Sequence, residues 1–469
     1  MRDHILFYLN GVAQRVEGDG AFQSVSRFLR YDQRATGTKI VCEEGDCGAC
    51  TVLIGRREGG RLVYRPINSC IQFMFQMDCA HVVSVEGLSR AGLTPLQDAM
   101  VRCHGAQCGY CTPGFIMAMA ALYEGAQGSG LGAQDVRAGL TGNLCRCTGY
   151  EPIIKAALEV SNQPSIDSLY PPSEMLHAFE SAEGDAVRIG TFFKPVDLEG
   201  AIRFKAEHPK CVIVQGATDF GVWCNKRGFK AEAILSLSGV PGLDDLRAGD
   251  GRLVVGGRVS LARLEEFVAD KLPQRAEVLD RFGSPQIKNA GTLAGNIANA
   301  SPIADSLPFL YVSGASLELT GLAGRREVPI ESFYRGYKTL DLAADEIITR
   351  IFIPLPAKGD TLRLYKVSKR SHLDISSFTA AMLMRRSGDR IERIRIAYGG
   401  VGPLVLRLPR TESFLAGKPF SMSTLEDAGP IAREEITPIS DVRGSRDFRL
   451  QLADNVLRRF YHEVAGAAG

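Results

Sequence analysis

Residues 103–151 read CHGAQCGYCTPGFIMAMAALYEGAQGSGLGAQDVRAGLTGNLCRCTGYE and contain two closely spaced cysteine pairs. Cys108 and Cys111 form a Cys-x2-Cys motif, and Cys145 and Cys147 form a Cys-x-Cys motif after thirty-three intervening residues. Four thiols in two pairs can supply all the ligands of one metal centre. We therefore expect this segment to fold around a metal site.

A helix is expected directly after each cysteine pair. Thr112 and Pro113 predict the N-cap and first turn of an apolar helix that Gly125 ends, and Pro152 predicts the start of a second helix over IIKAALEV. Helix N-termini carry free N–H groups and the positive end of the helix dipole. If the two N-termini face each other, they favour the negative charge of four thiolates, as an electron-accepting sulfide cluster requires.

A second cysteine set lies upstream in the stretch CEEGDCGAC. Cys42, Cys47 and Cys50, with Cys70 twenty residues further on, have the spacing of a plant-type [2Fe-2S] site. The small residues between these cysteines let the backbone wrap closely and aim N–H groups at the sulfurs. Structural zinc is the alternative for all eight cysteines. Zinc sites prefer two Cys-x2–4-Cys knuckles, so a Cys-x-Cys half and the lone Cys70 favour iron-sulfur clusters.

Composition limits the class of protein. The 469 residues suggest about three domains of ~150 residues each. A net charge of +2 with 23% charged residues provides no basic stripe, so nucleic acid is not expected as a partner. Twelve cysteines, eight of them at ligand spacing, indicate a reducing compartment. Cys79 and Cys103 lie outside both ligand spacings, and we expect them to be buried free thiols. With no signal-peptide pattern and no stretch long enough to span a bilayer, we expect a cytoplasmic protein without a membrane partner.

The pattern along the chain changes several times. Asn10-Gly11 between two apolar stretches predicts a type I' hairpin in a β-rich unit over residues 1–88. Residues 89–160 have a helical pattern, and residues 161–188, rich in Pro, Ser and acids, predict a surface linker. The last helix is expected after three strands, with one apolar face made of Phe448, Leu452, Val456, Phe460 and Val464.

Two glycine-containing segments interrupt the alternating pattern that follows the predicted linker. VIVQGATDF covers residues 212–220, and NAGTLAGNIANASPIAD covers residues 289–305. Small and hydrogen-bonding residues expose backbone N–H groups, which can bind phosphate. Taken alone, each segment is also compatible with an ordinary turn.

The motifs GDCGACTV, QCGYCTPGF and GNLCRCTGY resemble the iron-sulfur region of the xanthine dehydrogenase family of molybdenum hydroxylases. The two glycine-containing segments resemble the FAD domain of the same family. The similarity is greatest to the iron-sulfur and FAD subunit of two-subunit bacterial members. It implies an α+β multidomain fold, namely a β-grasp ferredoxin domain over 1–88, a helical [2Fe-2S]-binding domain over 89–160, an α+β (PCMH-like) FAD-binding domain over 189–358 and an α/β C-terminal domain over 359–469.

The resemblance also implies the residues that contact FAD. These are Ile213, Val214, Gln215, Gly216, Ala217, Thr218, Asp219, Phe220, Phe282, Thr292, Leu293, Ala294, Gly295, Asn296, Asp305, Ile348 and Lys366. One departure is visible, because the usual Gly-Gly-Asn of the family is Ala294-Gly295-Asn296 here. The added methyl group is tolerable if the φ angle of Ala294 is negative.

Electron transfer is the function that the resemblance implies. Electrons from substrate hydroxylation at a molybdenum cofactor on a large partner subunit would enter the Cys108/Cys111/Cys145/Cys147 cluster. They would then pass to the Cys42/Cys47/Cys50/Cys70 cluster, to FAD and on to NAD+ or oxygen. No acid-base or nucleophilic residues are predicted in this chain, and an (αβ)2 assembly is expected. The alternatives are the same subunit serving an aldehyde or another N-heterocycle, and a non-catalytic iron-sulfur module.

Overall fold

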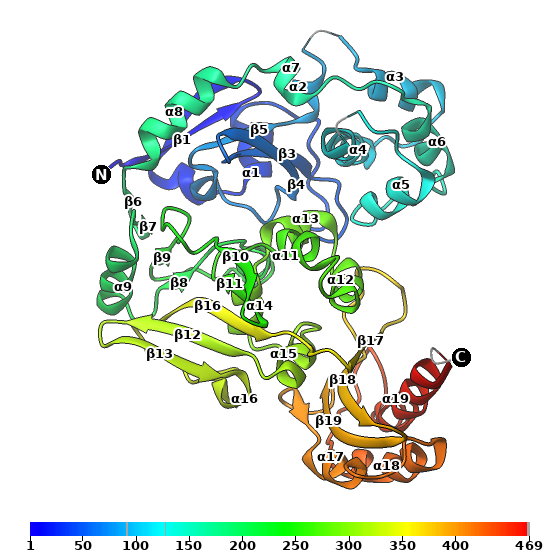
Figure 1. The fold of residues 1–469 in the computed structure, drawn as a ribbon. Coiled ribbons are helices and arrows are strands. Elements are labelled where there is room, and N and C mark those ends of the chain that lie inside the picture. Colours follow the sequence, from blue (N-terminus) through cyan, green and yellow to red (C-terminus); the bar gives the residue numbers. More distant parts are fainter. Residues whose placement is uncertain (91, 127, 467–469) are drawn as a thin grey trace. The chain divides into compact units, whose positions relative to one another are not determined.

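The computed structural model describes residues 1–90, 92–126 and 128–466, and the chain forms two compact units. Unit 1 contains Met1–Pro241 and Ser284–Gly291, and unit 2 contains Gly242–Gly283 and Thr292–Gly469. Each unit combines helices with β-sheets (Figure 1), so the expected α+β multidomain fold is confirmed. None of the helices in the described ranges combines the length and the apolarity needed to cross a bilayer.

Unit 1 begins with a five-stranded sheet in the order β2-β1-β5-β3-β4. Its strands are β1 (His4–Leu9), β2 (Val12–Glu17), β3 (Thr51–Glu58), β4 (Arg61–Asn68) and β5 (Ala80–Val83). Asn10 and Gly11 have φ angles of 49° and 80°, which confirms the predicted hairpin turn. β1 pairs in parallel with β5. Short helical turns surround this sheet at Gly18–Phe22, Val25–Arg27 (α1), Phe28–Asp32, Met74–Met77 and Val85–Leu88 (α2).

A helical region follows the sheet. Its helices are α3 (Pro95–Arg102), α4 (Thr112–Ala126), α5 (Ala133–Gly139) and α6 (Glu151–Glu159). Two details of the predicted α4 are wrong. Gly125 lies inside the helix, and Cys111, not Thr112, is the capping residue, because its carbonyl accepts a hydrogen bond from the N–H of Phe115 at 3.2 Å. The first helical turn therefore follows a predicted metal ligand directly.

The expectation of a surface linker at residues 161–188 is wrong. This segment forms α7 (Ile166–Leu169) and α8 (Ser173–Glu183), followed by the start of β6. Tyr170 and Phe179 are buried in the same core as the helical region. Each apolar stripe is only one or two turns long, and Pro171-Pro172 separates the two helices, so the sequence lacks the sustained period that would reveal them. The domain boundaries proposed from the sequence remain predictions.

The rest of unit 1 contains a four-stranded sheet in the order β6-β7-β9-β8. Its elements are β6 (Val187–Ile189), β7 (Phe192–Lys194), α9 (Leu198–Glu207), β8 (Val212–Ile213), α10 (Phe220–Arg227), β9 (Ile234–Leu235) and α13 (Pro285–Ala290). Asp197 is the N-cap of α9, since its carboxylate accepts the N–H of Gly200. The first glycine-containing segment connects β8 to α10.

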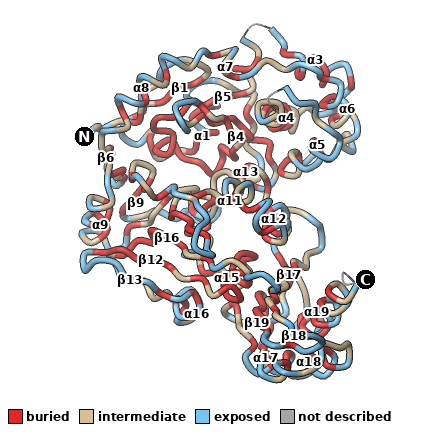
Figure 2. Tube along the Cα trace, in the orientation of Figure 1, coloured by how far each residue is buried: buried red, intermediate tan, exposed pale blue. Residues whose placement is uncertain are grey.

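Unit 2 is built on a five-stranded sheet in the order β10-β11-β16-β12-β13. The strands are β10 (Leu246–Gly249), β11 (Arg252–Gly256), β12 (Ser316–Gly321), β13 (Gly324–Pro329) and β16 (Ile347–Pro354), with β14 (Tyr334–Gly336) and β15 (Thr339–Leu340) as a separate pair. The helices are α11 (Leu261–Val268), α12 (Pro273–Asp280), α14 (Leu293–Ala298), α15 (Leu307–Ser313) and α16 (Ile330–Phe333). Figure 2 shows α15 as largely buried, in agreement with its position in the core of this unit.

The C-terminal part of unit 2 is a β17-β18-β19-β20 sheet with three helices. Its elements are β17 (Asp360–Val367), β18 (Phe378–Ser387), β19 (Arg390–Gly399), β20 (Leu406–Arg407), α17 (Pro409–Leu415), α18 (Met422–Glu434) and α19 (Arg446–Gly466). The predicted apolar face of α19 is correct for Val456, Phe460 and Val464, but Phe448 is 44% exposed. The helix instead buries Arg449, which donates to Ser377 O at 2.9 Å and Asp441 Oδ1 at 2.7 Å.

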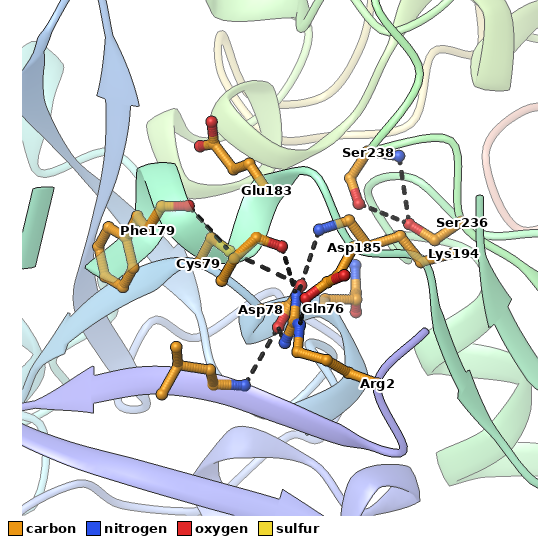
Figure 3. A network of polar contacts seen from close by, with 12 residues as sticks. Arg2, Gln76, Asp78, Cys79, Phe179, Glu183, Asp185, Lys194, Ser236 and Ser238 are labelled. Carbon is orange, nitrogen blue, oxygen red and sulfur yellow. Dashed lines mark hydrogen bonds and ion pairs between the residues drawn. The ribbon is translucent and has the colours of Figure 1, made fainter. Parts of the chain in front are cut away.

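A buried charge network connects the first residues of the chain to β7 within unit 1 (Figure 3). Asp78 accepts hydrogen bonds from Arg2 at 2.8 Å, from Lys194 Nζ at 2.7 Å and from the N–H of Leu6 at 3.1 Å. The Asp78 and Lys194 side chains are only 2% and 5% exposed. Burial alone would raise the pKa of Asp78, but the bonds and charges of Arg2 and Lys194 outweigh it and lower the pKa to about 2.

Candidate functional site

The first cysteine set gathers in the loop before β3 and at the end of β4. The N–H of Cys47 donates to Cys42 Sγ at 3.5 Å. Hydrogen bonds from the Cys47 and Cys70 thiols lower the pKa of Cys42. A hydrogen bond from Cys70 likewise lowers the pKa of Cys50, against the effect of burial. The four predicted ligands therefore lie together, and Cys70 connects both ends of the set.

Backbone conformation in this loop depends on glycine. Gly45 and Gly48 have φ angles of 79° and 69°, which L side chains rarely adopt. A Cβ atom on Gly48 would also lie 2.1 Å from the carbonyl oxygen of Gly142. The small residues that the sequence places between the thiols are thus required both for the turn and for close packing.

The second cysteine set lies in the two loops that precede α4 and α6. Cys108 and Cys147 have their sulfurs 3.6 Å apart. Burial would raise the pKa of Cys145, but its hydrogen bonds from Thr148 Oγ1 at 3.1 Å and Thr148 N at 3.5 Å lower it. Cys111 hydrogen-bonds Cys145, which brings the fourth sulfur into the group. Cys108 and Cys147 are exposed.

The two cysteine sets are in direct contact through their loops, within unit 1. The N–H of Leu144, which precedes Cys145, donates to the carbonyl oxygen of Cys47 at 3.0 Å. The side-chain amide of Asn143 donates to Gly48 O at 3.0 Å, and Gln286 donates to Asn143 Oδ1 at 2.9 Å. A single hydrogen bond therefore links the residue next to a ligand of the second set to a ligand of the first set.

Each set offers only thiols as donors, and this is the ligand chemistry of an iron-sulfur cluster. Within the ranges that the structure describes, no group of three or more His, Cys, Asp or Glu side chains is arranged around a single metal ion. All twelve cysteines are free of disulfides, and Cys79 and Cys103 are buried as predicted. Neighbouring thiols on glycine-dependent loops near helix starts fit an iron-sulfur cluster.

The first predicted flavin segment lies in unit 1, close to Cys70 in the fold. Gln72 Nε2 donates to Gly216 O at 2.6 Å, and Gln76 Nε2 donates to Gln215 O at 2.9 Å. A Cβ atom on Gly216 would lie 2.0 Å from Ala290 O, and Ala217 has a φ angle of 53°. The segment is therefore held in a fixed shape by the residues that follow the last ligand of the first cysteine set.

The other predicted flavin residues lie in unit 2. Thr292 caps α14 by accepting the N–H of Gly295 at 3.0 Å, and Ala294 lies within this helix, so the φ angle of Ala294 meets the condition for the added methyl group. Asp305 Oδ2 accepts a hydrogen bond from Lys366 Nζ at 2.5 Å. Asn296 accepts a bond from Ser306, Phe282 is half-buried, and Ile348 is buried in β16.

Two supporting residues near these sites were missed by the sequence analysis. Ser376 donates to Asp305 Oδ1 at 2.6 Å, and Asn225 on α10 contacts the first cysteine set, as described below. Neither belongs to a motif, and both partners are distant in sequence, so no local signal could have identified them.

Three family descriptions match separate parts of the chain. Residues 84–158 match "[2Fe-2S] binding domain", residues 185–356 match "FAD binding domain in molybdopterin dehydrogenase", and residues 363–464 match "CO dehydrogenase flavoprotein C-terminal domain". The class of protein is thus an oxidoreductase component that binds iron-sulfur and FAD cofactors.

Relatives extend this result to most of the chain. Xanthine dehydrogenase 1 of Arabidopsis thaliana is 28% identical over 97% of this chain and 39% of its own length. Aldehyde oxidase 1 of Bos taurus is 28% identical over 98% of this chain and 39% of its length. The solved structure of quinoline 2-oxidoreductase from Pseudomonas putida 86 is 30% identical, with a TM-score of 0.55, and the match covers 59% of this chain and 97% of that one.

The chain belongs to the molybdenum hydroxylase family that includes xanthine dehydrogenase, as its iron-sulfur and FAD component. It spans about two fifths of the length of the curated relatives that it matches, 39% for the plant xanthine dehydrogenase.

Proposed function

We propose that this chain is the electron-transfer part of a xanthine dehydrogenase. It would receive electrons from a molybdenum cofactor on a partner polypeptide, conduct them through two [2Fe-2S] clusters to FAD, and deliver them to NAD+. Cys108, Cys111, Cys145 and Cys147 would hold the first cluster, and Cys42, Cys47, Cys50 and Cys70 the second. Twelve cysteines without disulfides suit a reducing, cytoplasmic compartment.

The contact between the two cysteine sets is the observation that carries this proposal. A relay needs successive centres close together, because electron transfer slows steeply with distance. The hydrogen bond from Leu144 N to Cys47 O at 3.0 Å provides a short path from the residue beside Cys145 to a ligand of the other set. Two unrelated structural metal sites would have no need of such a contact.

The second cysteine set also suggests where the partner binds. Cys108 and Cys147 are exposed, and a cluster that receives electrons must be reachable from outside the chain. Val41, Tyr110 and Leu144 are 54%, 49% and 37% exposed in the loops that carry the two sets. Exposed apolar side chains around an exposed cluster site are typical of a protein interface. We propose that the molybdenum-cofactor-binding large subunit covers this surface, in an (αβ)2 assembly.

The family resemblance assigns flavin contacts to each of the glycine-containing segments. A bound flavin accepts electrons singly and releases them as a pair, which suits transfer from clusters to NAD+. Gly216 to Asp219 offer backbone N–H groups in a loop that Gln72 and Gln76 hold in place. In unit 2, Thr292 is the N-cap of α14, where the helix N-terminus would favour phosphate, and the buried Asp305–Lys366 pair supplies fixed polar groups.

A second candidate has its own support. The match to quinoline 2-oxidoreductase is at 30% identity, and the Bos taurus relative is named as an aldehyde oxidase, so the same component can be proposed to serve an aldehyde or another N-heterocycle hydroxylase. Substrate choice would then be a property of the partner.

Assays on the assembled enzyme test the proposal. The chain is co-produced with the large subunit that co-purifies with it, and xanthine, an aldehyde and quinoline are each offered with NAD+ or oxygen. We expect xanthine with NAD+ to give the fastest turnover, and the isolated chain to hydroxylate none of these substrates. Faster turnover of quinoline or the aldehyde would favour the second candidate. Turnover with oxygen alone would reject NAD+ as the acceptor.

A further inference from the structure

Asn225 on α10 joins the two ends of the first cysteine set. Its side-chain amide nitrogen lies 2.9 Å from the carbonyl oxygen of Glu43 and 2.9 Å from that of Cys70. Glu43 directly follows Cys42, and Cys70 is the last ligand of the set. One NH2 group thus connects two parts of the ligand loop that are far apart in sequence.

The orientation of this amide follows from its partners. Backbone carbonyl oxygens only accept hydrogen bonds, so the NH2 group of Asn225, with its two hydrogens, must face both of them. Its oxygen in that position would meet two other oxygens without a hydrogen between them. Asn225 is therefore a double donor to the ligand loop.

The helix that carries Asn225 is itself held against the loop. A Cβ atom on Gly221 would lie 2.5 Å from Ile71 O, so the α10 backbone lies directly on the residue after Cys70. The side chain of Ile71 in turn packs where a Cβ on Gly45 would be, at 2.7 Å. Phe220, the first residue of α10, is buried in the core of unit 1. Asn225 consequently has a fixed position relative to the cysteines.

We propose that Asn225 is a positioning residue of the Cys42/Cys47/Cys50/Cys70 set, which fixes the ligand loop and raises the midpoint potential of the cluster bound there. The inference rests on the proposed function, because it requires that cluster. Carbonyl oxygens carry partial negative charge, and the two N–H donors of Asn225 offset it beside the ligands. Without the donors, the added electron of the reduced cluster would be less stable.

Two variants separate this role from general stability. Asn225→Leu keeps a similar volume but has no donor, and Asn225→Asp keeps the shape but places a negative oxygen against the two carbonyls. Arg227→Ala, at an exposed position on the same helix, is the matched control. Each protein is titrated with reductant and followed by EPR. The EPR signal of the Cys42 set is identified as the one that persists in the Cys108→Ser variant. Thermal unfolding is measured in parallel.

We expect the midpoint potential of the Cys42-set signal to become more negative in Asn225→Leu and still more negative in Asn225→Asp. The signal of the Cys108 set should not move, and Arg227→Ala should match the native protein. Loss of the Cys42-set signal alone, with flavin and the other cluster retained, would also support positioning. An unchanged potential and line shape would overturn the inference even if the unfolding temperature fell, as would joint loss of all cofactors in both variants. A native protein without a Cys42-set signal would instead refute the proposed function.

Discussion

Replacing Cys147 with serine is expected to reduce substrate-driven electron delivery to NAD+ by at least about 100-fold in the assembled enzyme. The Cys147 sulfur lies 3.6 Å from that of Cys108, within the set proposed to receive electrons. Serine stays protonated at neutral pH and is a poor iron ligand, so this cluster should be lost or altered. The Cys42 set has its own ligands, and NADH oxidation by an artificial acceptor should continue because it needs only the flavin.

A matched control is available in the same region. Cys103 is a buried thiol outside both ligand spacings, so Cys103→Ser removes one sulfur without removing a ligand. Steady-state turnover and EPR spectra are compared in the two variants, and Cys103→Ser should retain both cluster signals. Near-normal turnover in Cys147→Ser, with the Cys108-set signal absent, would show that electrons bypass this cluster.

Replacing Asp78 with asparagine is expected to lower the free energy of unfolding of unit 1 by about 3 kcal/mol. Among the described residues, Asp78 provides the only carboxylate in direct contact with Lys194 Nζ, at 2.7 Å, and the change removes that carboxylate. The change also leaves Arg2 without its 2.8 Å partner (Figure 3). A buried cation without a partner is strongly destabilising. Urea unfolding followed by the fluorescence of Trp223, the only tryptophan, reports on unit 1.

The same network predicts the pH dependence of this effect. The pKa of Asp78 is lowered to about 2 from its ordinary 3.8, so its stabilisation is fully present above about pH 4 and is lost as the pH falls toward 2. The stabilities of the native protein and Asp78→Asn should therefore converge in acid. Asp185→Asn is the control, because its half-exposed carboxylate lies 3.7 Å from Arg2 and should contribute less than about 1 kcal/mol. A pH-independent difference between native and Asp78→Asn would contradict the ion network as the cause.

The features that sequence predicted well depend on local spacing. The cysteine sets, the Asn10-Gly11 turn and the helix starts after each cysteine pair follow from residues a few positions apart, and the structure has all of them. A ligand spacing restricts the fold strongly, because four thiols must reach one small centre.

Features that depend on distant partners could not be predicted. Asn225 lies 182 residues from Glu43 in sequence, and the Gln72–Gly216 bond spans 144 residues. The helices between Ile166 and Glu183 were missed because their apolar stripes are short. The face that α19 buries depends on the buried Arg449, whose partners lie outside the helix. Such pairings are decided by tertiary packing and leave no periodic signal.

We propose that the two cysteine sets hold two clusters close enough to exchange electrons. Low-temperature EPR of the fully reduced native protein tests it directly, because magnetic coupling between two reduced clusters falls steeply with their separation. Since Leu144 N and Cys47 O are 3.0 Å apart, we predict two distinct signals that split or broaden each other, and loss of this interaction in Cys147→Ser. A single signal, or two signals that show no mutual effect, would contradict the relay.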